Sequence, residues 1–303
     1  MPDPAGTCRR ALRRKLAVGL PFAILVFLAI GCSRPLVLPP SPLYDVGNPR
    51  ASAGLSEAEA REALLGHYAH YDVVAYEDNG TKTPMKTFVV SYGFTDFVEK
   101  DGKILQIDRF VHASHKINQR GVESSFPDTA AEAIVPRVQE VRLYEEGGVW
   151  KVFRSETPLL LGVGGDPSEP LSRDPRSSLL LDPDADGHPG VTVKITIGGF
   201  IRGELYITRR EIYRNFLTLY PDGRWIGRVE DLSEQFVIGA SMDILKQESD
   251  NRQIPDRGLN PVILVRVPES VSTWDRLKEM RDELFPPEPS FLEESGKSVR
   301  KNG

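Results

Sequence analysis

Cysteine is nearly absent from this chain: of its 303 residues, only Cys8 and Cys32 are cysteines. Two cysteines near one end cannot form a framework of disulfides around a folded core. The sequence also contains no P-loop, dinucleotide-binding fingerprint or H-E-x-x-H motif. A nucleophile elbow begins at Gly239 and Ser241 but breaks at Asp243, where that motif needs glycine. None of these motifs points to catalysis.

Neither a long apolar run nor an excess of basic charge is present. The uncharged run from Leu16 to Gly31 has sixteen residues and contains Pro21, whereas a membrane-spanning helix needs about 20 apolar residues. The formal net charge of −5 argues against nucleic acid as a partner. With 40% hydrophobic and 27% charged residues, the composition is that of a soluble globular protein.

The N-terminus has the physical marks of an export signal. A positive patch (Arg9, Arg10, Arg13, Arg14 and Lys15) precedes the uncharged run, which ends at Cys32. The run Ala29-Ile30-Gly31-Cys32 resembles a bacterial lipoprotein signal, although Ala29 stands where that family usually has Leu, Val or Ile. The resemblance implies that Cys32 is lipidated and becomes the new N-terminus. The alternative is an uncleaved signal anchor.

In lipoproteins with such a signal, the residue after the lipidated cysteine determines which membrane the protein is sorted to. Position 33 is serine rather than aspartate, which implies the periplasmic face of the outer membrane if the source has two membranes. We therefore expect a protein anchored to the cell envelope by its lipid. Cleavage before Cys32 would leave no free thiol in the mature chain, which suits an oxidising compartment.

Composition divides the chain into four parts. Residues 1–31 are the predicted signal, and residues 32–54, which contain five prolines, form a stiff solvated tether. Residues 55–285 form the body, and residues 286–303 a flexible tail. The body can be read as two halves, 55–163 and 191–285, joined by a linker over 164–190, or as one barrel in which 164–190 is a long loop.

Strands with tight turns dominate the body. Ser56 and Glu59 form a capping-box pattern that starts a short helix, and a second helix runs from the cap Ser272 to Phe285. Between them, five dipeptides predict two-residue hairpin turns: Asn79-Gly80, Asp101-Gly102, Gly147-Gly148, Gly198-Gly199 and Asp222-Gly223. In the strand 191–197, alternate residues from Val191 to Ile197 face one side, and the long run 200–220 should bend near Arg209.

The predicted fold class is therefore all-β, an antiparallel β-barrel or a two-sheet sandwich with short terminal helices. Both closures limit the number of exposed sheet edges.

Asp182, Asp184 and Asp186 form the best local motif. Carboxylates at positions one, three and five of a loop, followed by Gly187, resemble the first half of a calcium loop. Position twelve is Val193 rather than the bidentate glutamate of an EF-hand, so a remote carboxylate would have to complete the shell. The alternative is an acidic turn whose aspartates bind the local backbone. Calcium is the single candidate cofactor.

Four histidines form two H-x-x-H pairs, His67 with His70 and His112 with His115. A spacing of three places both rings on one face of a helix, but His67 and His70 lie past the expected helix end at Gly66. His112 and His115 lie in a strand-like run, where the same spacing places the two rings on opposite faces. A shared zinc or copper site is therefore disfavoured.

Two further sets of residues leave alternatives open. The aromatic residues either pack the core or line a hydrophobic pocket: Trp150, Trp225, Tyr206, Tyr213, Phe216 and Tyr220. Arg209, Arg210 and Arg214 either cover a solvent face or receive an anionic headgroup.

The functional expectation is a lipid-anchored envelope protein that binds rather than catalyses. Its ligand would be a lipid or a hydrophobic small molecule. The first alternative is a structural or interaction protein with a calcium-stabilised loop. The second is a hydrolase with paired carboxylates, which need not be close together in sequence. Protein partners are not indicated.

Overall fold

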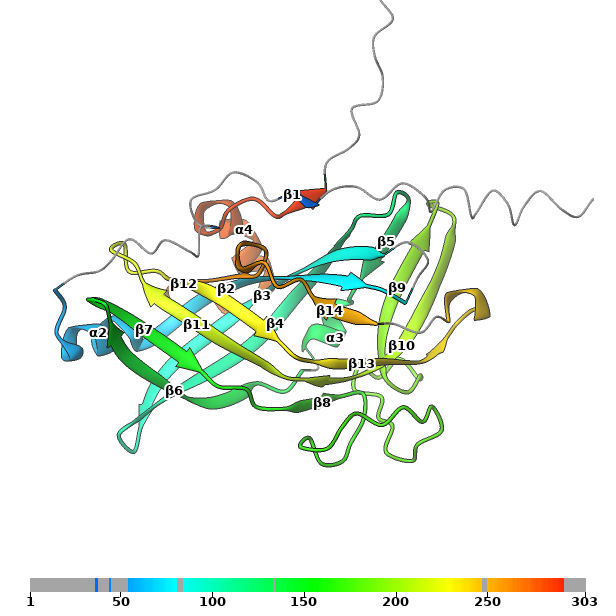
Figure 1. Cartoon of the computed structure of the whole chain (residues 1–303), viewed down its shortest axis with the longest axis horizontal. Helices are drawn as coiled ribbons and strands as arrows, with labels where there is room; N and C mark the ends of the chain where they lie inside the picture. Colours follow the sequence, from blue (N-terminus) through cyan, green and yellow to red (C-terminus); the bar gives the residue numbers. More distant parts are fainter. Residues whose placement is uncertain are drawn as a thin grey trace, which may run out of the picture.

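Strands make up most of the molecule (Figure 1). The computed structural model describes residues 36–37, 44, 54–80, 84–132, 134–246 and 250–291. The predicted signal segment and Cys32 lie outside these residues. The elements of the ordered body run in chain order as follows: α2 (Glu57–Leu64), β2 (Gly66–Asp78), β3 (Met85–Lys100), β4 (Lys103–Ile117), β5 (Val122–Ser125), α3 (Asp128–Glu132), β6 (Arg137–Glu146), β7 (Val149–Arg154), β8 (Leu159–Leu161), β9 (Val191–Ile197), β10 (Ile201–Glu211), β11 (Tyr213–Leu219), β12 (Trp225–Asp231), β13 (Glu234–Ala240), η2 (Asp243–Leu245), β14 (Asn251–Gln253), η3 (Arg257–Leu259), β15 (Pro261–Arg266) and α4 (Trp274–Leu284). Two short strands, β1 (Leu36–Val37) and β16 (Ser290–Phe291), pair with each other outside this body.

Eight antiparallel strands close into a barrel, which confirms the predicted fold class. Around the ring the order is β4, β3, β2, β15, β12, β11, β7 and β6, and the pairing of β4 with β6 closes it. Every strand of the ring is therefore paired on both sides over part of its length. Closure removes the exposed edges that would otherwise invite aggregation.

Three long strands, β2, β3 and β4, extend beyond this ring. The first part of β4 pairs with β6 up to Asp108, and the later part pairs with β5 at Ser114. The register between β3 and β4 shifts at Tyr92 and Gly93, which marks a β-bulge. A Cβ at Gly93 would overlap the carbonyl oxygen of Arg109, so this close approach needs glycine. The bulge bends β4 from one sheet into the other.

The extension is a second, open wall built from β5, β9, β10 and β13, with β8 on β10 and β14 on β2. The run 200–220 is broken at Ile212, where β10 ends and β11 begins in the barrel. The predicted interruption is therefore present, but it lies two to three residues beyond Arg209 and Arg210. The loop 164–190 leaves β8 and returns through β9 to the same strand, β10.

Two of the five predicted two-residue turns are confirmed. Asp101 and Gly102 have φ angles of 53° and 74° between β3 and β4, and the 147–148 turn connects β6 to β7 in the same way. The other three dipeptides lie at hairpin connections, but these are longer. The flanking pairs there are Asp78 with Met85, Ile197 with Ile201, and Leu219 with Trp225. Residues 81–83 lie outside the described residues.

The helices follow their predicted caps with one correction. The Ser56 side chain accepts a hydrogen bond from the Glu59 amide, and the Glu59 carboxylate accepts one from the Ser56 amide, so the capping box is confirmed. The second helix has Thr273, not Ser272, at its N-cap, without a side-chain hydrogen bond. The five-residue α3 was not predicted, because so short a helix has no periodicity to detect.

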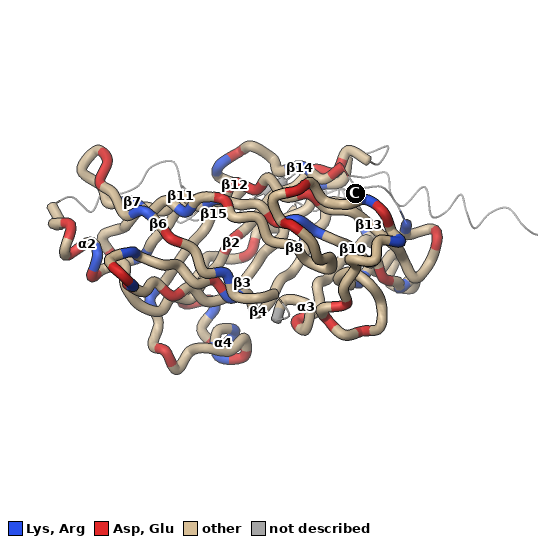
Figure 2. The backbone as a smooth tube through the Cα atoms, turned by 90° about the horizontal axis from the view of Figure 1, so that it is seen from below, with Lys and Arg blue, Asp and Glu red and all other residues tan. Residues whose placement is uncertain are grey.

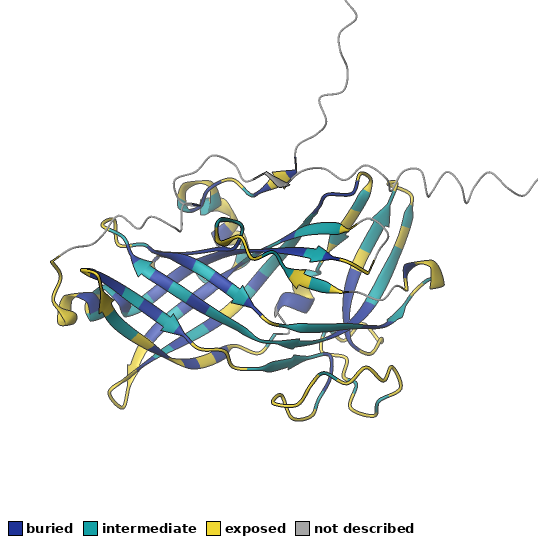
Figure 3. Ribbon diagram, viewed as in Figure 1, coloured by how far each residue is buried: buried dark blue, intermediate teal, exposed yellow. Residues whose placement is uncertain are grey.

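One core fills the narrow end of the barrel. Trp225 and Leu217 are at most 1% exposed there, and Ala60 and Leu64 of α2 pack against the same cluster. Figure 3 shows buried segments in dark blue along β11 and β12, the strands that carry Leu217 and Trp225.

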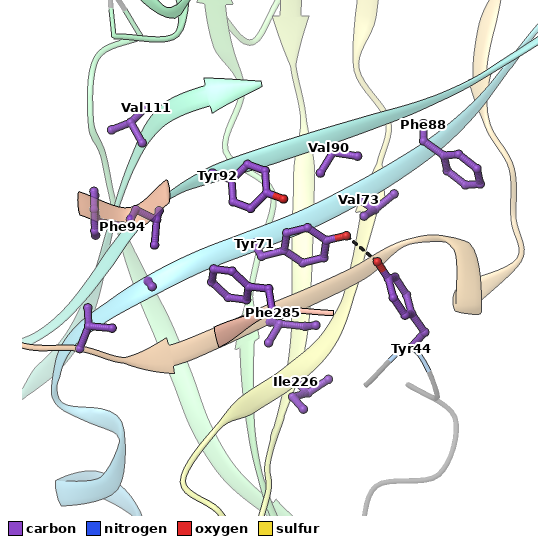
Figure 4. Packing of buried hydrophobic residues seen from close by; sticks show 14 of the residues in the cluster. Tyr44, Tyr71, Val73, Phe88, Val90, Tyr92, Phe94, Val111, Ile226 and Phe285 are labelled. Carbon is purple, nitrogen blue, oxygen red and sulfur yellow. Dashed lines mark hydrogen bonds between the residues drawn. The ribbon is translucent and has the colours of Figure 1, made fainter. Parts of the chain in front are cut away.

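A second core lies on the outer face of β2 and β3 (Figure 4). There Tyr71 stacks on Phe285, and its hydroxyl lies 2.5 Å from that of Tyr44. Because Tyr44 is buried and β1 pairs with β16, the expected solvated tether over 32–54 and flexible tail over 286–303 are wrong at these described positions. Apolar and hydrogen-bonding contacts with the body outweigh solvation there. Within these two segments, the structure describes only residues 36–37, 44, 54 and 286–291.

Candidate functional site

A cavity of about 730 Å³ lies between the second wall and the extended parts of β2, β3 and β4. Most of the side chains that line it are apolar. Val191, Val193, Ile195 and Ile197 of β9 all reach it, as the alternation of that strand predicted. Its volume falls within the roughly 300–1,000 Å³ of small-molecule sites.

Strand register explains why so many aliphatic side chains meet here. Ile207 of β10 is paired with Val191 on one side and with Val237 on the other. Residues opposite one another on adjacent strands share a face of the sheet. Three neighbouring strands therefore present one continuous apolar surface to the cavity.

Charged side chains form the floor of the cavity. Nη2 of Arg209 donates to Asp231 at 2.8 Å and to the Tyr76 hydroxyl at 3.1 Å, and its Nε donates to Glu211 at 3.3 Å. Tyr76 in turn donates to Asp231. Burial, together with the adjacent Asp231 carboxylate, raises the pKa of Tyr76 well above its usual value, so this hydroxyl stays protonated. The contacts tie β10 to β2 and β12.

A second polar layer separates this floor from the packed end of the barrel. The Tyr213 ring lies between the guanidinium groups of Arg137 and Arg154, at 4.3 and 4.0 Å from its centroid. Arg154 donates to Asp108 at 3.2 Å, and both side chains are at most 2% exposed. Burial raises the pKa of Tyr213 to about 12. The layer is a fixed base beneath the cavity.

Two histidines of β4, His112 and His115, line the cavity among its apolar residues. His115 lines the cavity, and its Nδ1 lies 2.7 Å from the Ser124 hydroxyl. Val89 is paired with His115, and Ile195 with Ser124, so aliphatic side chains flank the polar pair on both sides. Burial, with a smaller contribution from the positive charge of Arg209, lowers the pKa of His115 to about 4. The imidazole is therefore neutral at pH 7.

The two histidines of each pair have different hydrogen-bond or ring partners. His70 is hydrogen-bonded to Thr95 and Asp72 inside the barrel, whereas His67 stacks on Phe94 and bonds to Asp96. On β4, His112 stacks on Trp274 of α4, while His115 bonds to Ser124. In the part of the chain that the structure describes, histidine joins no group of three metal-binding side chains.

The three aspartates of the acidic loop do lie together. One carboxylate oxygen of each of Asp182, Asp184 and Asp186 falls within 4.8 Å of the others. The same carboxylates also bind the local backbone: Asp182 accepts from Gly187 at 2.9 Å, and Asp184 accepts from Thr192 at 2.9 Å. Burial raises the pKa of Asp184. This geometry fits a calcium loop and also an acidic turn whose aspartates bind the local backbone, so calcium binding stays a prediction.

Calcium is expected to raise the melting temperature if this loop binds it. An ion that binds only the folded state stabilises it by about 2.7 kcal/mol at 100 times its Kd, or roughly 5 °C or more for a chain of this size. Asp184→Ala should abolish the rise, and Asp174→Ala, in the same loop but outside the triad, should keep it. Scanning calorimetry with Ca²⁺ and with Mg²⁺ measures this. An equal response to both ions, or none, would rule the site out.

The open alternatives for the aromatic and basic residues are resolved residue by residue. Trp150 and Trp225 belong to the core, and of the six aromatics only Tyr213 lines the cavity described here. Arg209 is part of the floor rather than of a solvent face. Arg210 and Arg214 do not line the cavity and form ion pairs with Glu234 and Glu230.

The sequence contains two adjacent carboxylate pairs, Glu145-Glu146 and Glu230-Asp231, which the structure places apart from each other. Glu145 lies on β6 and is exposed, as is its neighbour Glu146, which binds Lys151. Of the second pair, Asp231 belongs to the cavity floor, while Glu230 accepts from Arg214 outside it. Both floor carboxylates, Glu211 and Asp231, accept hydrogen bonds from Arg209. Asp72 and Asp78 also line the cavity, and hydrolysis by paired carboxylates stays a prediction.

The sequence analysis missed the His115–Ser124 pair and the contacts of Arg209 with Tyr76 and Asp231.

Outside the cavity, Figure 2 shows acidic and basic residues interspersed along the chain. No described helix combines the length and the apolar character needed to cross a bilayer. No family model, curated protein or solved structure matches the chain, so the geometry of the cavity carries the functional argument.

Proposed function

We propose that the protein is a non-catalytic binding module for a lipid or a hydrophobic small molecule, held at the cell envelope by a lipid anchor on Cys32. The cavity of about 730 Å³ is the observation that supports binding. A structural or interaction protein needs a packed core but no such space. The acidic loop is compatible with calcium stabilisation of the same body, as a secondary feature.

The size of the cavity sets the expected affinity. At about 30 Å³ per non-hydrogen atom, it holds a ligand of roughly 24 such atoms. Drug-sized ligands gain about 0.3 kcal/mol per atom, which amounts to about 7 kcal/mol, or a Kd of several micromolar. Such binding suits a carrier or sensor that must also release its ligand.

A matched pair of tryptophan variants tests binding. Ile195 faces the cavity, whereas its neighbour Lys194 is exposed on the other face of β9. We expect the neutral fluorescent probe N-phenyl-1-naphthylamine to bind the wild type saturably. Ile195→Trp should weaken this at least about fivefold, or ~1 kcal/mol, because the indole occupies ligand space.

Lys194→Trp is the control in the same titration, since it adds the same ring on the solvent side. Equal affinities for the two variants, or no saturable binding by the wild type, would contradict the proposed function.

The anchor has its own prediction. Cys32→Ser should leave the protein in the soluble fraction or as an unprocessed precursor, because a lipoprotein signal needs the thiol for acylation. Fractionation with mass spectrometry of the intact protein measures both outcomes. A Cys32→Ser protein that still sediments with membranes at the processed mass of the wild type would overturn the anchor without affecting the cavity.

A further inference from the structure

We propose that the ligand is an uncharged amphiphile, a long apolar chain with a hydroxyl or carbonyl group, and that His115 in the cavity wall binds this polar group. This inference rests on the proposed binding function and specifies its ligand class. The charges of the lining and the position of the His115–Ser124 pair carry it.

The lining disfavours an anionic headgroup. Among the described residues that reach the cavity, four are carboxylic acids, Asp72, Asp78, Glu211 and Asp231, and Arg209 is the single lysine or arginine. The guanidinium of Arg209 is already bound on all three nitrogens, because Nη1 also donates to Gln235. A fatty-acid carboxylate would therefore meet excess negative charge and find no free cation.

An ammonium headgroup meets the opposite difficulty. The carboxylates are committed to protein donors: Asp231 to Arg209 and Tyr76, and Glu211 to Arg209 and Arg137. Asp72 is bound to His70, and Asp78 accepts from the amides of Gly80 and Asp250. A buried cation would have to lose its hydration and share these acceptors with the protein groups that already donate to them. An uncharged polar group avoids both costs.

His115 offers the hydrogen bond that an uncharged group needs. Its Nδ1 is bound to Ser124, and no described protein group bonds to Nε2. A serine hydroxyl can donate or accept, so the imidazole can adopt either tautomer. Nε2 then accepts from a ligand hydroxyl or donates to a ligand carbonyl. The lowered pKa of His115 agrees with a neutral ring in this role.

The register surrounds this group with aliphatic side chains. Val89 and Ile195 flank the pair along one row of the wall, and Val193 and Ile207 lie in the adjoining apolar cluster. A bound molecule can keep its polar atom at His115 while its chain covers aliphatic surface. Each buried methylene group then contributes about the same binding free energy, whatever the headgroup of the ligand.

Competition among ligands of equal chain length tests the class. The probe bound to wild-type protein is N-phenyl-1-naphthylamine, and the competitors at pH 7.5 are 1-dodecanol, dodecanoate and dodecylammonium. Because the chain is constant, differences report the headgroup. We expect dodecanol to displace the probe at a concentration at least about tenfold lower than either ion, since burying an unpaired charge is costly.

Substitutions at position 115 test the residue. His115→Phe should weaken dodecanol about fivefold, the usual value of one hydrogen bond, and His115→Gln, which keeps a donor and an acceptor, should restore most of the affinity. His188→Phe, on the exposed acidic loop, is the control and should bind dodecanol like the wild type.

The outcomes separate the two proposals. If dodecanoate or dodecylammonium competes best, or if His115→Phe binds dodecanol as tightly as the wild type, the ligand class is wrong while the binding function stands. If the wild type binds neither probe nor dodecanol, the binding function itself fails.

Discussion

Arg154→Met is expected to lower the free energy of unfolding by about 3–5 kcal/mol, the usual cost of breaking a buried ion pair. Arg154 is fully buried and donates to Asp108 at 3.2 Å. Without the guanidinium, the buried Asp108 carboxylate keeps its hydrogen bonds with Thr95 and Gln106 and a 4.0 Å contact with Nδ1 of His70, but it loses its arginine partner. The change also removes one of the two cations that enclose the Tyr213 ring. Urea denaturation followed by circular dichroism measures the loss.

Two further variants make this result specific. Asp108→Asn combined with Arg154→Met removes the unpaired charge and should recover part of the stability. Lys103→Met breaks an exposed ion pair with Glu140 and should cost less than about 1 kcal/mol. An Arg154→Met protein within about 1 kcal/mol of the wild type would mean that the polar layer is not a structural base for the cavity.

Acidification is expected to destabilise the protein through His115. Its pKa falls from 6.5 to about 4 on folding, chiefly because burial disfavours the charged imidazole. The unfolded chain therefore binds a proton that the folded chain does not, and stability is lost as the pH falls from about 6.5 towards 4. At 1.36 kcal/mol per pKa unit, the full effect is about 3 kcal/mol.

His115→Gln isolates this contribution, because glutamine keeps polarity but does not titrate. Carboxylates that titrate in the same range contribute to wild type and variant alike, so they cancel in the difference. Between pH 7 and pH 4, the variant should lose about 3 kcal/mol less stability than the wild type. Identical pH profiles from urea denaturation would show that His115 is not buried as a neutral group.

Local chemistry made much of this fold predictable. The Ser56 capping box, the Asp101-Gly102 turn and the alternation of 191–197 each follow from contacts within a few residues. Closure of the barrel depends instead on the pairing of β4 with β6 and on the bulge at Gly93. A lone glycine in a strand pattern signals a bulge only weakly, so barrel and sandwich stayed equivalent alternatives.

The candidate site was less predictable, because most of its contacts join residues on different strands. Asp182, Asp184 and Asp186 are close in sequence, so their clustering could be foreseen. Arg209 was expected to cover a solvent face, because its partners Tyr76 and Asp231 lie on other strands. Ser124, which bonds to His115, belongs to a four-residue strand with no strong pattern. Cavities form between elements, and periodicity within one element does not reveal them.

Native mass spectrometry of the protein purified from membranes tests binding most directly. We expect one small molecule per chain, recoverable into organic solvent and uncharged at neutral pH, with little or none retained by Ile195→Trp. A chain that repeatedly carries no apolar molecule when it is isolated under gentle conditions would contradict the account.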